Sequence, residues 1–186
     1  FVAEVASTCN EVLLMRYLLG RTQDKSERAY LINHFLDQFK GTVYRQTMFA
    51  EFELEMGRMS EAGAALTADA LCEKYLALNK LYFGPDMVSD DEIALEWARI
   101  PHFFYDYYVF QYATGFSAAV AIANRILAEG ESAVADYKRF LSAGSSADPI
   151  SLLKIAGVDM STAGPVDSAL ALFGELIDEL EKTLEE

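Results

Sequence analysis

One stretch, residues 4–20 (EVASTCNEVLLMRYLLG), shows the pattern that decides the fold class. Val5, Val12 and Leu13 supply apolar positions in a helical pattern, and Gly20 is a typical helix stop. Helical spacing followed by a stop signal recurs along the rest of the chain. The pattern predicts further helices over residues 25–40, 42–57, 60–83, 89–100, 104–128, 131–142, 148–156 and 166–183.

The breaks between these helices carry signals of their own. Ser60 is a candidate N-cap for the helix that follows it, and Ser89 with Glu92 forms a capping-box pattern ahead of Pro101. No alternating run with an Asn-Gly or Asp-Gly turn indicates a hairpin, and no fixed period of 20–50 residues indicates a solenoid. We therefore expect an all-α fold, with residues 1–186 forming one helical segment.

Composition excludes several classes of protein. The 186 residues are 52% apolar, enough for a substantial core, and 15 basic against 29 acidic residues give a net charge of −14. Such a chain repels nucleic-acid phosphates and anionic membrane surfaces, so neither is an expected partner. Cys9 and Cys72 lie far apart in the sequence, which does not suggest a disulfide scaffold and suits a reducing, cytoplasmic location.

Several catalytic motifs are missing. No glycine-rich phosphate loop precedes a helix, and no CxxC pair indicates a zinc ribbon or a thioredoxin-like site. A di-iron bundle needs Glu-x-x-His on two helices, but His34 and His102 are preceded at that spacing by Leu31 and Arg99. These absences disfavour nucleotide, thiol and di-iron chemistry.

Two acids on the first helix form one candidate site. Glu4 and Glu11 are seven residues apart, almost two helical turns, so both carboxylates share a face. Their neighbours are mainly apolar, and two acids on a half-buried face need a partner, often a metal or a histidine. A solvated acidic stripe explains the spacing equally simply, and the spacing alone leaves both interpretations open.

An aromatic segment forms the second candidate site. Tyr105, Tyr108 and Tyr112 follow an i, i+3, i+7 pattern, which would line three phenols on one helical face, with His102 at the helix entrance. Phenols and an imidazole that share one space are typical donors for a developing oxyanion. Tyrosines are also ordinary amphipathic core residues, so a purely structural role is the alternative. In residues 44–53, arginine and glutamate among aromatics indicate a structural internal ion pair.

Taken together and in order, these segments resemble oligoendopeptidase F, a zinc metallopeptidase related to thimet oligopeptidase. Five segments carry the resemblance: FVAEVASTCNE (1–11), RQTMFAEFE (45–53), YFGP (82–85), WARIPHFFY (97–105) and YVFQYATG (108–115). Residues 144–149 and 156–159 extend it toward the C-terminus, so the resemblance covers essentially the whole chain. The resemblance implies a mostly helical, clam-like shell around a deep channel that admits short peptides. This chain would be the C-terminal portion of that catalytic domain.

The resemblance also assigns roles to the candidate residues. Glu4 falls on the position of a zinc ligand, and Glu11 falls where an acid orients a ligand histidine. His102 and Tyr112 fall on positions that bind the substrate carbonyl and stabilise the oxyanion, and Tyr105 falls on a substrate contact. Tyr108 is a further expected substrate contact. It lies one residue before Val109, which stands where thimet oligopeptidase has a tyrosine.

One departure limits what the chain can do alone. The family's zinc is bound by two histidines of an HExxH motif and one Glu of the following helix, and this sequence contains no HExxH. We therefore expect an isolated chain to be inactive, or active only with its partner, the missing N-terminal part of the enzyme. We also expect a homodimer through an exposed channel face, or a co-purifying partner, at high concentration. The competing hypothesis is a non-enzymatic helical interaction domain with an aromatic peptide-binding groove.

Overall fold

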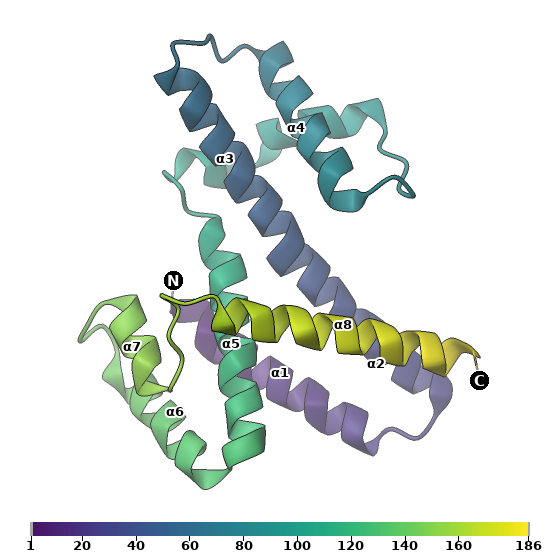
Figure 1. Ribbon diagram of the computed structural model, residues 1–186, viewed down its shortest axis with the longest axis vertical. Coiled ribbons are helices and arrows are strands. Elements are labelled where there is room, and N and C mark those ends of the chain that lie inside the picture. The colour runs from purple at the N-terminus through teal and green to yellow at the C-terminus, as the bar shows by residue number, and fades with distance from the viewer. Residues whose placement is uncertain (1, 186) are drawn as a thin grey trace. The chain divides into compact units, whose positions relative to one another are not determined.

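Residues 2–185, which the computed structural model describes, are helical along most of their length and contain no strand, which confirms the all-α prediction. None of the helices in this range is both long enough and apolar enough for a membrane span. The elements (Figure 1) are α1 (Ala3–Arg21), α2 (Lys25–Phe39), the π-helical turn η1 (Lys40–Tyr44), α3 (Arg45–Glu61), α4 (Ala68–Phe83), the 3-10 helices η2 (Asp91–Arg99) and η3 (Pro101–Phe104), α5 (Phe110–Glu129), α6 (Glu131–Ala143), α7 (Pro149–Ile155) and α8 (Gly164–Glu185).

The chain divides into two compact units. The first unit comprises Phe1–Val43 and Thr114–Glu186, and the second comprises Tyr44–Ala113. The chain leaves the first unit at the π-helical turn η1 and returns to it within α5. Every residue predicted from the aromatic segment belongs to the second unit, whereas Glu4 and Glu11 belong to the first.

Helix α2 is central to the first unit because it packs against both α1 and α8. The ring of Phe39 contacts the rings of Phe116 on α5 and Phe173 on α8, with centroids 4.7 and 5.4 Å apart. On α5, the small residues Ala118 and Ala119 are fully buried. An ion pair between Arg28 and Glu179 also joins α2 to α8, and α6 packs on α7 (Figure 1).

The second unit is built on α3 and α4, which pack side by side, with η2 against α4 (Figure 1). Thr67 caps α4 by accepting a hydrogen bond from the backbone N–H of Ala70. Aromatic and aliphatic side chains from all parts of the unit form one core: Met48, Phe49, Phe52, Leu71, Tyr75, Leu78, Ile100 and Val109. This core supports the candidate site described below.

Several predicted helix ends are wrong. Gly41 and Gly57 do not stop helices, because α2, η1 and α3 follow one another without a break. The stop expected at Gly20 is one residue early, since α1 ends at Arg21. Glycine costs a helix interior only about 1 kcal/mol, which packing outweighs. The predicted cap Ser60 lies within α3.

The aromatic segment differs most from its prediction. Asp90, not Ser89, caps the following 3-10 helix by accepting from the Ile93 N–H. The helix predicted from residue 104 begins at Phe110. Asp106 and Tyr107 have φ angles of 53° and 58°, and two successive left-handed residues cannot belong to a right-handed helix. The three tyrosines therefore do not share one helical face.

Candidate active site

The structure brings His102 and Tyr112 together in the second unit. The Tyr112 hydroxyl oxygen lies 3.3 Å from His102 Nε2, although one residue belongs to η3 and the other to the first turn of α5. Their rings meet edge to face, with centroids 5.9 Å apart and planes at 80°. An imidazole and a phenol within hydrogen-bonding distance provide two groups able to donate to one oxygen atom.

Two further phenol rings contact the same imidazole. Tyr108 stacks on His102 with an interplanar angle of 25° and a centroid separation of 5.9 Å. Tyr105 meets the imidazole edge-on at 5.7 Å, and Tyr108 also contacts Tyr105 and Tyr112. We call these four residues the His102 cluster. It assembles the four predicted side chains, although by a route other than the predicted helical face.

Core residues that precede the cluster members or lie between them in the sequence fix their positions. Ile100, Phe103 and Val109 pack into the second unit's core. Phe103 contacts the rings of Phe49 and Phe52 at centroid distances of 5.6 and 5.3 Å. Because these residues anchor the chain on both sides, His102, Tyr105 and Tyr108 remain at the surface of the unit. Burial of Val109 also explains why that position presents no polar group.

Glu53 is the residue near this cluster that sequence reasoning did not identify. It is 5% exposed on α3, and its Oε1 accepts a hydrogen bond from the backbone N–H of Tyr107 at 3.2 Å. Burial raises the pKa of its carboxyl, and the backbone amides of Tyr107 and Val109 act in the opposite direction. An acid within an apolar helical stretch is the sequence signal that could have marked it.

The ion pair predicted within residues 44–53 is wrong in its partner, which lies outside that segment. Arg45 forms an ion pair with Glu96 on η2, and Glu96 also forms an ion pair with Arg99. The hydroxyl of the fully buried Tyr75 donates to the other oxygen of Glu96 at 2.6 Å. This network joins α3, α4 and η2, so the structural interpretation fits it.

Glu4 and Glu11 are both exposed on α1. The Ser7 hydroxyl donates to Glu4 Oε2 at 3.3 Å. Within residues 2–185, no group of three or more His, Cys, Asp and Glu side chains is placed to hold a metal ion. A catalytic zinc takes three protein ligands, so the described residues do not form a complete zinc site. Glu4 has the chemistry of one ligand, a carboxylate open to its surroundings.

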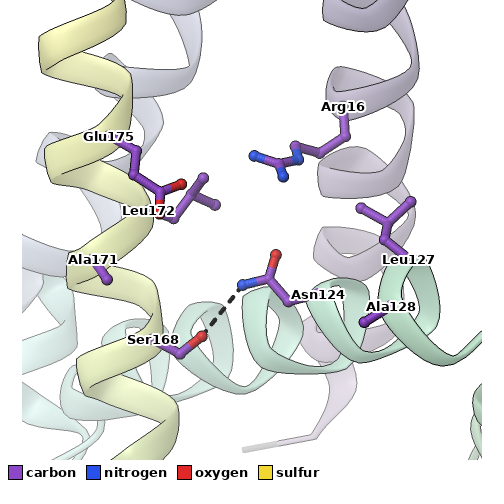
Figure 2. A pocket seen from close by; sticks show the side chains of 8 residues that line it. All are labelled: Arg16, Asn124, Leu127, Ala128, Ser168, Ala171, Leu172 and Glu175. Atoms are coloured by element: carbon purple, nitrogen blue, oxygen red, sulfur yellow. Dashed lines mark hydrogen bonds between the residues drawn. The ribbon is translucent and has the colours of Figure 1, made fainter.

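The first unit also contains a hollow of about 410 Å³ between α1, α5 and α8 (Figure 2). Arg16 extends toward it from α1 and Glu175 extends toward it from α8 (Figure 2). Asn124 donates to the hydroxyl of Ser168 at its edge, at 3.2 Å. One cation and one anion give the lining no net charge that would select a ligand, and it includes none of the predicted site residues.

Comparison with known proteins defines the class. Residues 1–172 match the model of Peptidase family M3, and the chain belongs to this family. It is 55% identical over 184 residues to oligopeptidase PepF of Bacillus subtilis, covering 99% of this chain and 28% of that protein. It is 45% identical to the chromosomal oligoendopeptidase F of Lactococcus lactis subsp. cremoris, covering 100% of this chain and 31% of that protein.

A solved structure agrees with these sequence matches. The crystal structure of oligoendopeptidase-F from Enterococcus faecium superposes with a TM-score of 0.95 at 49% identity, covering 100% of this chain and 36% of that one. The resemblance to oligoendopeptidase F and the all-α fold that it implies are therefore confirmed. The chain spans about a third of the length of the relatives that it matches.

Proposed function

We propose that this chain is the C-terminal portion of the catalytic domain of a cytoplasmic, zinc-dependent oligoendopeptidase that hydrolyses short peptides. The observation that carries the proposal is the His102 cluster, in which an imidazole and three phenols meet in a chain that belongs to Peptidase family M3. A family of peptidases needs donors for the oxyanion that forms when a peptide carbonyl is attacked. This cluster supplies two donors at one place.

Each residue of the cluster has a role in the proposal. The Tyr112 hydroxyl and the His102 imidazole donate to the carbonyl oxygen as it becomes an oxyanion, and their 3.3 Å separation lets both reach one atom. Tyr105 and Tyr108 contact the substrate beside them. Their side chains are 58% and 37% exposed, so both rings have surface left for a peptide chain.

Glu4 and Glu11 serve the metal in this proposal. Glu4 is one ligand, and Glu11 orients a ligand histidine, which metal-binding histidines usually require. The two histidine ligands belong to an HExxH motif outside residues 1–186. When bound, zinc lowers the pKa of a coordinated water and polarises a carbonyl. The partner of this chain is accordingly the remainder of the same enzyme.

A helical interaction domain is the second candidate. Phe104 beside the cluster and Tyr105 within it are 87% and 58% exposed, and an exposed aromatic surface of this kind suits a bound peptide as well as a substrate. The two functions differ in chemistry. An interaction domain binds a peptide without cleaving it, and a metal chelator leaves that binding unchanged.

The test uses the longer protein that contains this chain. We expect it to cleave an internally quenched peptide of about ten residues, to lose this activity to a chelator and to regain it with zinc. Glu4→Gln should abolish zinc binding in native mass spectrometry, whereas Glu11→Gln should weaken it about 10–100-fold. Glu181→Gln, an exposed position on α8, is the matched control. Peptide binding without cleavage, unaffected by chelator, would favour the interaction domain instead.

A further inference from the structure

Tyr107 is held at both ends by one face of α3. Its backbone N–H donates to Glu53 Oε1 at 3.2 Å. Its hydroxyl oxygen occupies the space beside Gly57, where a Cβ atom would lie 2.2 Å away. Glu53 and Gly57 are four residues apart on a helix and therefore lie one above the other on the same face. A buried carboxyl and a missing side chain thus fit the two ends of one tyrosine.

The segment held in this way is strained. Asp106 and Tyr107 both have left-handed φ angles, a conformation that residues other than glycine adopt rarely and at an energetic cost. Such a conformation persists only where the surroundings determine it. Here the left-handed pair lies between Tyr105 and Tyr108, whose rings both contact the His102 ring on η3. The left-handed pair therefore determines how those rings meet the imidazole.

The surroundings of the acid at position 53 offset its burial only in part: the backbone amides of Tyr107 and Val109 and the nearby His102 favour the ionised carboxyl, but burial has the larger effect and raises its pKa. Glu53 forms no ion pair among residues 2–185, and its second oxygen, Oε2, has no hydrogen-bond partner there. Burying a carboxyl in this way is unfavourable compared with burying an apolar side chain. An acceptor for the Tyr107 N–H is what an apolar residue at this position would not supply.

We propose that Glu53 and Gly57 are positioning residues, which lock the loop at Asp106 and Tyr107 and so set Tyr105 and Tyr108 against His102. The consequence for catalysis rests on the function proposed above, whereas the loop geometry does not. The lock depends on a hydrogen-bond acceptor and on free space, not on a negative charge. Glutamine keeps a carbonyl oxygen that can accept the Tyr107 N–H at nearly the same position, so it should replace Glu53.

The experiment has a structural arm and a kinetic arm. In the 186-residue chain, Glu53→Met removes the acceptor at similar size, and the Tyr107 amide should exchange with solvent about tenfold faster, the value of one hydrogen bond. In the longer enzyme, the same variant should raise KM for a short peptide about tenfold, because the substrate-contacting rings move. Glu53→Gln should restore both quantities to within about twofold. Glu55→Gln, two residues along α3 in an ion pair with Arg58, is the matched control.

A structural role alone gives a different result. Partial unfolding lowers the fraction of active enzyme, so kcat falls while KM stays unchanged. That pattern would overturn the proposal, as would unchanged Tyr107 exchange in Glu53→Met or a Glu53→Gln variant as impaired as Glu53→Met. If Glu53→Met does not fold, Gly57→Ala keeps the acceptor, displaces the Tyr107 ring and must raise KM. If no variant of the His102 cluster affects turnover, the proposed function fails. Hydrogen exchange of the Tyr107 amide still tests whether Glu53 and Gly57 position the loop.

Discussion

The Tyr112 hydroxyl lies 3.3 Å from His102 Nε2, although the chain between the two residues is not a continuous helix. It leaves the 3-10 helix η3, passes through two left-handed residues and enters α5 at Phe110. The pairing therefore depends on how this loop is anchored to the second unit's core.

Tyr75→Phe should destabilise the second unit. The Tyr75 side chain is fully buried and its hydroxyl donates to Glu96 Oε2 at 2.6 Å. Removing the hydroxyl leaves a carboxylate oxygen short of one donor, which should lower the free energy of unfolding by about 1–2 kcal/mol. Urea denaturation measures this change. Tyr30→Phe, on an exposed ring stacked on His34, should change it little, and equal effects of the two substitutions would contradict the network.

Alkaline pH should destabilise the fold through Cys9. Burial raises the pKa of its thiol from 9.0 to about 11. Between these values the unfolded chain releases the thiol proton first. The contribution of the protonated Cys9 thiol to the free energy of unfolding is therefore complete below pH 9 and is lost as the pH rises toward 11. The loss amounts to about 2–3 kcal/mol.

Unfolding free energies of wild type, Cys9→Ala and Cys72→Ala across pH 8–11.5 check this sign. The Cys9→Ala profile should be flatter than that of the wild type, and the Cys72→Ala profile should be parallel to it, because this variant keeps the buried Cys9 thiol. Parallel profiles for all three proteins would show that Cys9 does not titrate as expected.

Two glycine substitutions should have opposite signs. Gly157 has a φ angle of 80°, and a Cβ there would lie 2.2 Å from Nη1 of Arg125, which donates to the Ala156 carbonyl. Gly157→Ala should therefore cost about 1–2 kcal/mol of stability. Gly20 lies within α1 with open space around it, so Gly20→Ala should stabilise by about 0.4–1 kcal/mol. Thermal unfolding of both variants tests this prediction. A shift of the melting temperature in the same direction for both would contradict it.

The sequence predicts the helices well because apolar spacing reports burial directly. The sequence predicts helix ends poorly where the only signal is a glycine or a capping residue. Gly41 and Gly57 predict helix ends. The helix nevertheless continues through both, because tertiary packing outweighs the low helix propensity of one glycine. At Gly57 the reason is specific, since its missing side chain leaves room for the Tyr107 hydroxyl, a contact between residues 50 positions apart that no local pattern records.

The candidate site shows the same division. Family resemblance marks His102 and Tyr112, and the structure brings them together. The i, i+3, i+7 spacing predicted that the three tyrosines meet on one helical face. That explanation is wrong, because the backbone at Asp106 and Tyr107 is left-handed. The arginine and glutamates of residues 44–53 suggested an ion pair within that segment, but a sequence does not show which acid an arginine meets. Arg45 instead meets Glu96.

The 186-residue chain alone should not cleave peptides. It contains no HExxH motif, and its described residues hold no cluster of three metal ligands. We also expect self-association at high concentration, because exposed aromatic residues such as Phe104 and Tyr105 favour burial against another surface. Peptidase assays and sedimentation test both points. Turnover by the purified chain, or a monomer at millimolar concentration, would contradict them.

The central claim is that the His102–Tyr112 pair serves peptide hydrolysis, and one substitution tests it most directly. In the longer enzyme, Tyr112→Phe removes the proposed oxyanion donor and keeps the ring, so kcat should fall about 10²–10³-fold. Zinc content and melting temperature should remain those of the wild type, and Tyr30→Phe should retain full activity. A Tyr112→Phe enzyme that is folded, metal-loaded and as fast as the wild type would contradict the claim.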